Sequence, residues 1–351
     1  MILVAMLANA SAGDRQGEKP KSTVLSVLMD RITITGYGQL GYTYNSHDPS
    51  TQKESNTFDL KRIMLVANAE VFRNMTLFFM YDFSNATLHE YWGEYKFDKA
   101  FKVKLGQYKI PFTIENLLSP ASLEIISGAQ GVMYLAGIAP GYDDCYGAKA
   151  GRDLGLMAEG DFLPYHSWDF FSYKLGVFNG QGINSRDLNN HKDVIGWLMM
   201  NPLKEVSLGG SFYLGQGHAE KDNPFNSFKA GENYKRNRWS VGTEIKTKPV
   251  YVRAEYYQGK DNTIGSNGAY AVASFHLCRQ WDIIASVDYL NRNKDAQDGE
   301  FAAITKETDY IAGIQWNFYR RCRLQAQYVF QDRGAGHHNA NLIMTQFQLG
   351  F

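Results

Sequence analysis

The chain has 351 residues, with 36 Lys plus Arg against 36 Asp plus Glu, and 14% of its residues are aromatic. The balanced charge excludes a long-range field that would favour nucleic acid as a partner. No apolar run reaches the about eighteen residues that a membrane-spanning helix needs, and strand-forming residues dominate, which predicts one large all-β body.

The N-terminal segment is typical of an export signal. Residues 1–12 are mostly apolar and end in Ala10-Ser11-Ala12, a small-x-small cleavage pattern, although a basic start is missing. An ordinary N-terminal strand is the alternative interpretation. We therefore expect a signal peptide over residues 1–12 and a periplasmic N-terminal segment over residues 13–30, which could plug the barrel mouth, join a trimer contact or lead into the barrel.

Period-two alternation of apolar and polar residues predicts sixteen strands from residue 31 onward. In "WDIIASVDYL", for example, Trp281, Ile283 and Val287 alternate with Asp282 and Asp288. The predicted strands lie near 31–45, 57–73, 75–84, 88–97, 101–108, 152–162, 168–179, 193–201, 205–215, 236–247, 250–259, 268–277, 281–292, 308–318, 322–331 and 340–351.

The connections differ at the two ends of this predicted body. Those after even-numbered strands are short, such as "RN", "TKP" and "YRR", whereas those after odd-numbered strands are mostly longer and polar, such as "NSHDPSTQKESN". Alternation alone would also fit a soluble sandwich, but this asymmetry is typical of an outer-membrane barrel with periplasmic turns and extracellular loops. We therefore expect a transmembrane β-barrel over residues 31–351, in contact with outer-membrane lipid and lipopolysaccharide, with both termini and residues 13–30 in the periplasm.

The last strand has one apolar face. In "LIMTQFQLGF" the residues Ile343, Phe347, Leu349 and Phe351 fall on the same side of a two-residue period. This pattern predicts a final strand that closes the barrel against the first. The terminal residues Phe347, Leu349 and Phe351 also resemble the signal by which bacterial outer-membrane barrels are recognised by the barrel-assembly machinery.

One connection is far longer than the usual loop. Residues 109–151 join the fifth and sixth predicted strands and contain large apolar side chains that need burial, among them Phe112, Ile125 and Leu135. We expect this third loop to fold into the lumen and narrow it. An outward cap, or an arm that docks on a neighbouring subunit, is the alternative.

Three segments in this region carry a family resemblance. They are "LGQYKIPFTIENLLS", "GRDLGLMAEGDF" and "GVFNGQGINSRDLNNHKD". In this order they resemble the phosphate-selective porin O/P family of bacterial outer membranes. The resemblance implies a sixteen-stranded, trimeric barrel whose third extracellular loop forms the constriction, and it implies an arginine ladder and a lysine cluster that select anions.

The charges of this chain depart from that last pattern, because both signs occupy the expected lumen and long loop. One charge about 5 Å from an ion in water is worth only ~0.8 kcal/mol, so strong selection needs many like charges. Arg253 and Glu255, two residues apart on one face, are expected to pair. The candidate pore-lining residues are Arg62, Lys102, Lys104, Lys109, Glu115, Glu124, Asp143, Asp144, Lys149, Asp153, Lys174, Arg253, Glu255 and Arg323.

The sequence therefore predicts a porin for passive diffusion of small hydrophilic solutes and ions. Alternatives are a channel selective for phosphate or other anions, a non-conducting adhesin or scaffold barrel, and a sugar channel. The last would need stacking on lumen aromatics, for which the candidates are Tyr37, Trp92, Tyr213, Tyr251 and Tyr257.

The sequence contains no motif that indicates an enzyme. A nucleophile elbow and a glycine-rich phosphate loop are both missing, and the pair His337-His338 lacks a third metal ligand. We expect no catalytic activity, no cofactor and no metal. Cys278 and Cys322 fall in separate short turns, and we expect two free thiols.

Overall fold

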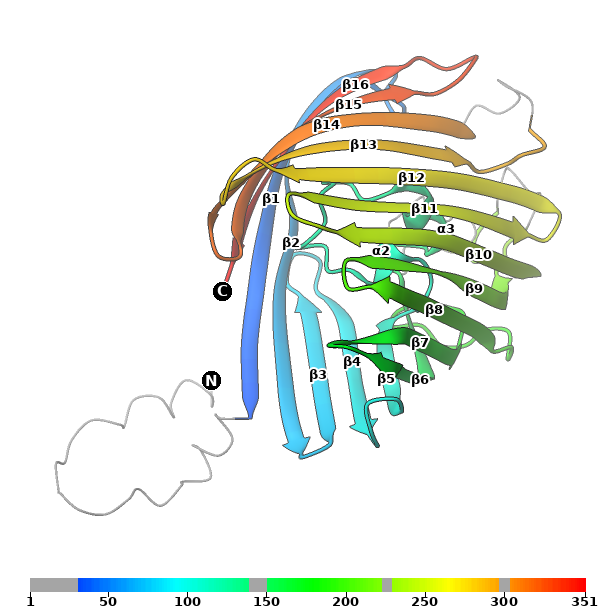
Figure 1. Ribbon diagram of the computed structural model, residues 1–351. Helices are drawn as coiled ribbons and strands as arrows, with labels where there is room; N and C mark the ends of the chain where they lie inside the picture. Colours follow the sequence, from blue (N-terminus) through cyan, green and yellow to red (C-terminus); the bar gives the residue numbers. More distant parts are fainter. Residues whose placement is uncertain (1–30, 139–149, 223–228, 297–303) are drawn as a thin grey trace, which may run out of the picture.

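The computed structural model describes residues 31–138, 150–222, 229–296 and 304–351. Sixteen antiparallel strands form a closed barrel in which each strand pairs with its neighbours in sequence, and β16 pairs with β1 (Figure 1). The predicted fold class and strand number are confirmed. The strands are β1 (Ile32–Asp48), β2 (Lys53–Phe72), β3 (Met75–Asp82), β4 (Thr87–Lys96), β5 (Lys102–Lys109), β6 (Arg152–Tyr165), β7 (Trp168–Phe178), β8 (Asp193–Leu203), β9 (Val206–His218), β10 (Asn233–Lys246), β11 (Val250–Asp261), β12 (Ile264–His276), β13 (Trp281–Asn291), β14 (Lys306–Tyr319), β15 (Cys322–Asp332) and β16 (Ala340–Gly350).

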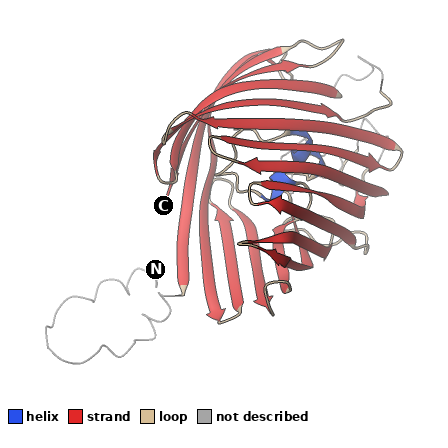
Figure 2. Cartoon of the chain, viewed as in Figure 1, coloured by secondary structure: helices blue, strands red, loops and turns tan. Residues whose placement is uncertain are grey.

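Two short helices lie between β5 and β6, inside the wall of strands. They are α2 (Ile114–Leu117) and α3 (Gln130–Leu135), and Figure 2 shows them within the barrel. No helix in the described ranges is long and apolar enough to cross a membrane.

The end of the barrel with short turns carries both the start of β1 and the C-terminus. β1 is paired with β16 from Tyr37↔Gly350 to Asn45↔Leu342. Beyond the strand, Phe351 exchanges backbone hydrogen bonds with Gly36, its N–H donating at 3.0 Å and its carbonyl accepting at 3.3 Å. The prediction that the last strand closes the barrel is confirmed.

The strands at the opposite end extend further than the sequence pattern predicts. Residues 46–56 were expected to be a polar loop, but β1 and β2 continue through most of them as a hairpin that turns at residues 49–52. Likewise β11 and β12 are joined by residues 262–263 alone. The error has a physical cause, because a hairpin with solvent on both faces needs no alternation of apolar and polar residues.

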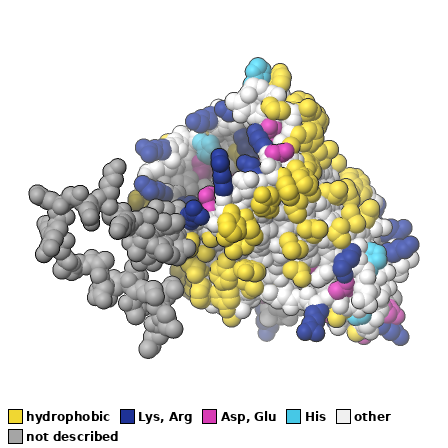
Figure 3. All heavy atoms as spheres, turned by 90° about the horizontal axis from the view of Figure 1, so that it is seen from below, with side chains coloured by type: hydrophobic (Ala, Val, Ile, Leu, Met, Phe, Trp, Pro, Cys, Tyr) yellow, Lys and Arg dark blue, Asp and Glu magenta, His cyan; other side chains and the backbone are white. Residues whose placement is uncertain are grey.

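The two faces of the wall differ as the alternation predicts. In β13 the side chains of Trp281, Ile283 and Val287 are exposed on the outside, whereas Asp282 and Asp288 are buried inside. Aromatic rings meet across outer strand ends, for example Trp281 and Trp316 at 5.7 Å between centroids. Figure 3 shows hydrophobic side chains spread over the outer wall, with charged side chains gathered toward its edges. This arrangement suits an apolar membrane around the barrel.

Candidate functional site: the lumen

The segment from residue 110 to residue 138 packs against the inner face of the wall. Phe112, Val132 and Leu135 are fully buried, and they belong to one apolar cluster with wall residues such as Tyr213 and Tyr257. The remainder of the long connection, residues 139–149, lies outside the described residues. We call residues 110–138 the inner segment.

Strand β11 holds the inner segment by two charged side chains. The carboxylate of Glu255 accepts hydrogen bonds from the backbone N–H groups of Ile114 at 2.6 Å and Glu115 at 3.1 Å. The guanidinium of Arg253 donates to the carboxylates of Glu115 at 3.0 Å and Glu124 at 2.9 Å.

The expected pairing of Arg253 with Glu255 is therefore wrong. Each of the two side chains binds the inner segment, and the Tyr270 hydroxyl lies between them, accepting from Arg253 and donating to Glu255 at 2.9 Å each. Because all these groups are buried, satisfied hydrogen bonds are what makes their burial tolerable.

Further contacts fix the inner segment along β13 and β15. Asp288 accepts a hydrogen bond from the backbone N–H of Gln130 at 2.6 Å, and Gln327 accepts one from that of Ile126 at 3.0 Å. Gly131 lies so close to the wall that an added Cβ atom would be 1.8 Å from the ring of Tyr257. The inner segment is thus fastened to the wall from β9 to β16 and, through Gln39, to β1.

The opposite wall, from β4 to β7, carries alternating charges. The ammonium group of Lys104 lies 3.1 Å from the carboxylate of Glu94 and 2.9 Å from that of Glu159, which also pairs with Lys174. Beside them, the guanidinium of Arg152 pairs with Glu90 at 2.8 Å. The lumen charges on this side therefore largely compensate one another.

A hollow of about 270 Å³, which we call the passage, lies between this wall and the inner segment. It is lined by Trp92, Lys104, Lys109, Arg152, Leu117, Ser119 and Pro120 among others. Lys109 donates hydrogen bonds to the backbone carbonyls of Asn116, at 2.7 Å, and Leu118.

The passage adjoins a wider space at the end of the barrel with short turns. This second hollow, of about 550 Å³, is lined by Tyr37, Arg320, Arg321 and Arg323 among others. Both hollows share Met80 and Ser119 as lining residues, so they are neighbours.

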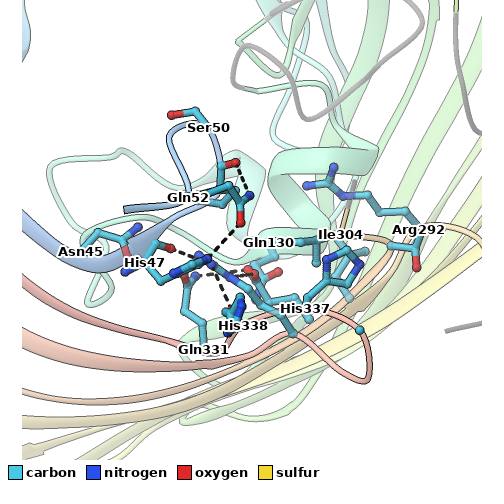
Figure 4. A pocket seen from close by; sticks show the side chains of 16 residues that line it. Asn45, His47, Ser50, Gln52, Gln130, Arg292, Ile304, Gln331, His337 and His338 are labelled. Carbon is cyan, nitrogen blue, oxygen red and sulfur yellow. Dashed lines mark hydrogen bonds and ion pairs between the residues drawn. The ribbon is translucent and has the colours of Figure 1, made fainter. Parts of the chain in front are cut away.

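The other mouth of the barrel opens among the long loops. A polar hollow of about 730 Å³ lies there, between the β1–β2 hairpin, the β13–β14 connection and the β15–β16 loop (Figure 4). Gln130 of α3 contributes to its lining. The rings of His47 and His338 are 4.6 Å apart, and Arg333 donates a hydrogen bond to the backbone carbonyl of His47 at 2.8 Å.

The predicted pore-lining residues fall into distinct groups. Glu115, Glu124, Arg253 and Glu255 anchor the inner segment, whereas Lys104, Lys109 and Lys174 line the passage. The remaining ones have other environments: Lys102 lies 3.6 Å from Asp161, Asp153 accepts from the backbone N–H of Gly180 at 2.5 Å, Arg323 donates to Gln315 at 2.9 Å, and Arg62 faces Gln39 in register. Asp143, Asp144 and Lys149 lie outside the described residues.

Several functional residues were missed. Glu90 and Arg152 pair in the passage, and Tyr270, Asp288 and Gln327 hold the inner segment. Strand parity already placed Asp288 in the lumen, so alternation was an available signal, but nothing in the sequence indicated its partner.

Most of the lumen aromatics considered for sugar stacking are engaged elsewhere. Tyr213 packs edge-on against Phe112 at 6.0 Å, and Tyr257 is fully buried under Gly131. Trp92 stacks on Phe78 at 4.9 Å and has the Lys104 ammonium 4.2 Å from its ring centroid.

Comparisons with known proteins agree with this architecture. The family model described as phosphate-selective porin O and P matches residues 34–159, which confirms the predicted resemblance over that part of the chain. No curated protein sequence matches the chain.

Solved structures show the same fold at low sequence identity. OprB of Pseudomonas putida has a TM-score of 0.68 at 12% identity, covering 93% of this chain and 96% of that one. An anion-selective porin from Comamonas acidovorans has a TM-score of 0.64 at 13% identity, covering 91% and 99%. A trimer form of OmpT from Vibrio cholerae has a TM-score of 0.63 at 13% identity, covering 92% and 100%. These likenesses show the barrel fold, and the family match over residues 34–159 supports an outer-membrane channel for small solutes.

Proposed function

We propose that this protein is a porin for passive diffusion of small hydrophilic solutes, narrowed by its inner segment. The observation that carries the proposal is the position of that segment in the lumen. Its hydrogen bonds run along β9–β16 and to β1, and the hollows between it and β4–β7 offer a path for solutes.

The charges along this path support weak selectivity. Lys104, Lys174 and Arg152 each lie within ion-pair distance of a glutamate, so their fields are largely cancelled. Lys109 contacts backbone carbonyls, which leaves a small positive excess. A single charge about 5 Å away changes the local ion concentration about fourfold in water. We expect a mild preference for anions.

The same proposal includes the location, the orientation and the oligomeric state of the protein. The barrel sits in the outer membrane among lipid and lipopolysaccharide, with its short turns and both termini in the periplasm. Phe347, Leu349 and Phe351 serve as the assembly signal, and a homotrimer is the assembly state. The apolar outer wall, the position of Phe351 beside Gly36 and the trimeric OmpT neighbour support these points.

Single-channel recording in a planar bilayer tests the proposal. Ohmic steps, a small anion-directed reversal potential under a salt gradient and no block by phosphate or malto-oligosaccharides are the expected results. Block by millimolar phosphate would favour an anion-specific channel, and block by sugars a sugar channel. Folded protein without conductance would overturn every channel function and favour an adhesin or scaffold.

A further inference from the structure

The outer wall carries a group of lysines at one sector of its loop-side rim. Lys235 on β10, Lys260 on β11, Lys294 after β13 and Lys306 on β14 are all exposed. Among the described residues, none of the four makes an ion pair with a carboxylate. We call these four residues the rim lysines.

Strand register places Lys260 and Lys294 next to each other on the outside, with Lys235 and Lys306 on the flanking strands β10 and β14. Lys260 is paired with Gly265, and a Cβ atom on Gly265 would lie 3.6 Å from Cδ of Lys294. The side chain of Lys294 thus runs over the outer face of Gly265, beside Lys260. Alternation along β11 and β14 gives the same side, since Tyr256 and Tyr310 are exposed outward like Lys260 and Lys306.

An apolar hollow lies below the rim lysines on the same strands. It has a volume of about 460 Å³, with Ala271, Ala273, Ala285 and Ala312 among the residues that line it and with Tyr310 and Phe330 beside them. Lys306 is four residues from Tyr310 along β14, about 13 Å at ~3.3 Å per residue. Because the lysine side chain covers part of that distance, one amphipathic molecule is long enough to reach both the ammonium group of Lys306 and the apolar hollow.

We propose that this sector binds lipopolysaccharide, with phosphates of the lipid A headgroup on the rim lysines and an acyl chain in the alanine-lined hollow. The inference rests on the proposed outer-membrane location. Charge complementarity selects this occupant, because unpaired ammonium groups at the loop-side rim match phosphates at the headgroup level of the outer leaflet. A second copy of the chain seated here would have to supply carboxylates for the rim lysines.

Among the described residues of β13–β15 and their connections, two exposed acidic residues flank the patch. Asp295 follows Lys294 in the chain, and Asp332 on β15 is paired with Thr308. Neither makes an ion pair with a rim lysine. The patch therefore ends at β15, and the proposed headgroup site is confined to β10–β14.

The test compares two triple variants of the full chain in detergent. One replaces rim lysines (Lys260→Gln, Lys294→Gln, Lys306→Gln), and the control replaces exposed basic residues of the short turns (Lys204→Gln, Lys248→Gln, Arg279→Gln). Binding of bisphosphorylated lipid A and of its dephosphorylated form is measured by native mass spectrometry. We expect at least tenfold weaker binding of bisphosphorylated lipid A by the rim variant, and less than a twofold change in the control. Equal losses in both variants, or equal binding of the dephosphorylated lipid by the unaltered protein, would overturn the proposal.

A second variant separates lipid from a subunit interface. Ala273→Trp fills the hollow and should weaken lipid A binding without changing the mass of the assembly. A fall in assembly mass would instead identify the hollow as a subunit contact and overturn the proposal. Conductance distinguishes this inference from the proposed function: a conducting protein without lipid A binding refutes the inference alone, and a non-conducting protein that binds lipid A refutes the channel alone.

Discussion

Replacing Arg253 by Met should release the inner segment and widen the channel. The guanidinium is fully buried and joins Glu115 and Glu124 at 3.0 and 2.9 Å, so its loss leaves two carboxylates of the segment without their cation. Removing one partner of a buried ion pair typically costs about 3–5 kcal/mol. Glu115 keeps the hydrogen bond from the backbone N–H of Ala129, at 2.6 Å, which places the cost near the lower end. Even about 3 kcal/mol shifts the docked–undocked equilibrium by roughly a hundredfold.

Single-channel recording checks this prediction. The Arg253→Met channel should show larger, noisier steps than the unaltered protein. Lys246→Gln is the control. Lys246 lies on β10, next to the strand of Arg253, and it pairs with Glu244 of its own strand rather than with the inner segment. Heat-modifiable mobility on gels establishes that each barrel has folded. Unchanged step size and noise in folded Arg253→Met would refute the reasoning that the ion pairs of Arg253 with the inner segment limit the open cross-section of the channel.

Three further outcomes follow from contacts elsewhere. Gly131→Val should displace α3 because even a Cβ atom would overlap the Tyr257 ring at 1.8 Å; conductance should rise, and Tyr257→Ala in the same chain should partly restore the original step size. Lys104→Gln removes a cation held between two glutamates, so the reversal potential in a salt gradient should move toward cations, by up to about fourfold in permeability ratio. Phe351→Ala removes the ring that packs over Gly36, and we expect a lower yield of folded protein in outer-membrane fractions, measured against Tyr319→Ala as an exposed aromatic control.

The architecture was predictable because every strand of a barrel wall repeats the same local pattern, the alternation of apolar and polar residues. Strands such as β13 and β15 alternate so regularly that the sequence assigns Asp282, Gln325 and Gln327 to the lumen without any knowledge of their partners. The extensions of β1 and β2 were not predictable in the same way. Residues 45–56 of that hairpin are almost all polar, so the alternation that marks a strand disappears there.

The inner segment shows where sequence reasoning stops. Arg253 and Glu255 are two residues apart on one face, and proximity favours a pair between them. Their actual partners are about 140 positions away in the chain. No periodicity connects such distant groups, because which wall a long connection meets depends on how its apolar residues, such as Phe112 and Val132, fill the barrel.

The position of the inner segment also supports the proposal that a lumen with many charges conducts without strong selection. The buried charges on the attached side, such as Arg253 and Glu255, are consumed in holding the segment, and they are shielded from the permeating ion. The wall from β4 to β7, along the proposed path, presents Lys104 between Glu94 and Glu159. An ion there meets both signs within a few ångströms, and fields of opposite sign at similar distance nearly cancel. We therefore expect the selectivity of this channel to depend less on the number of lumen charges than on which of them the inner segment leaves uncovered.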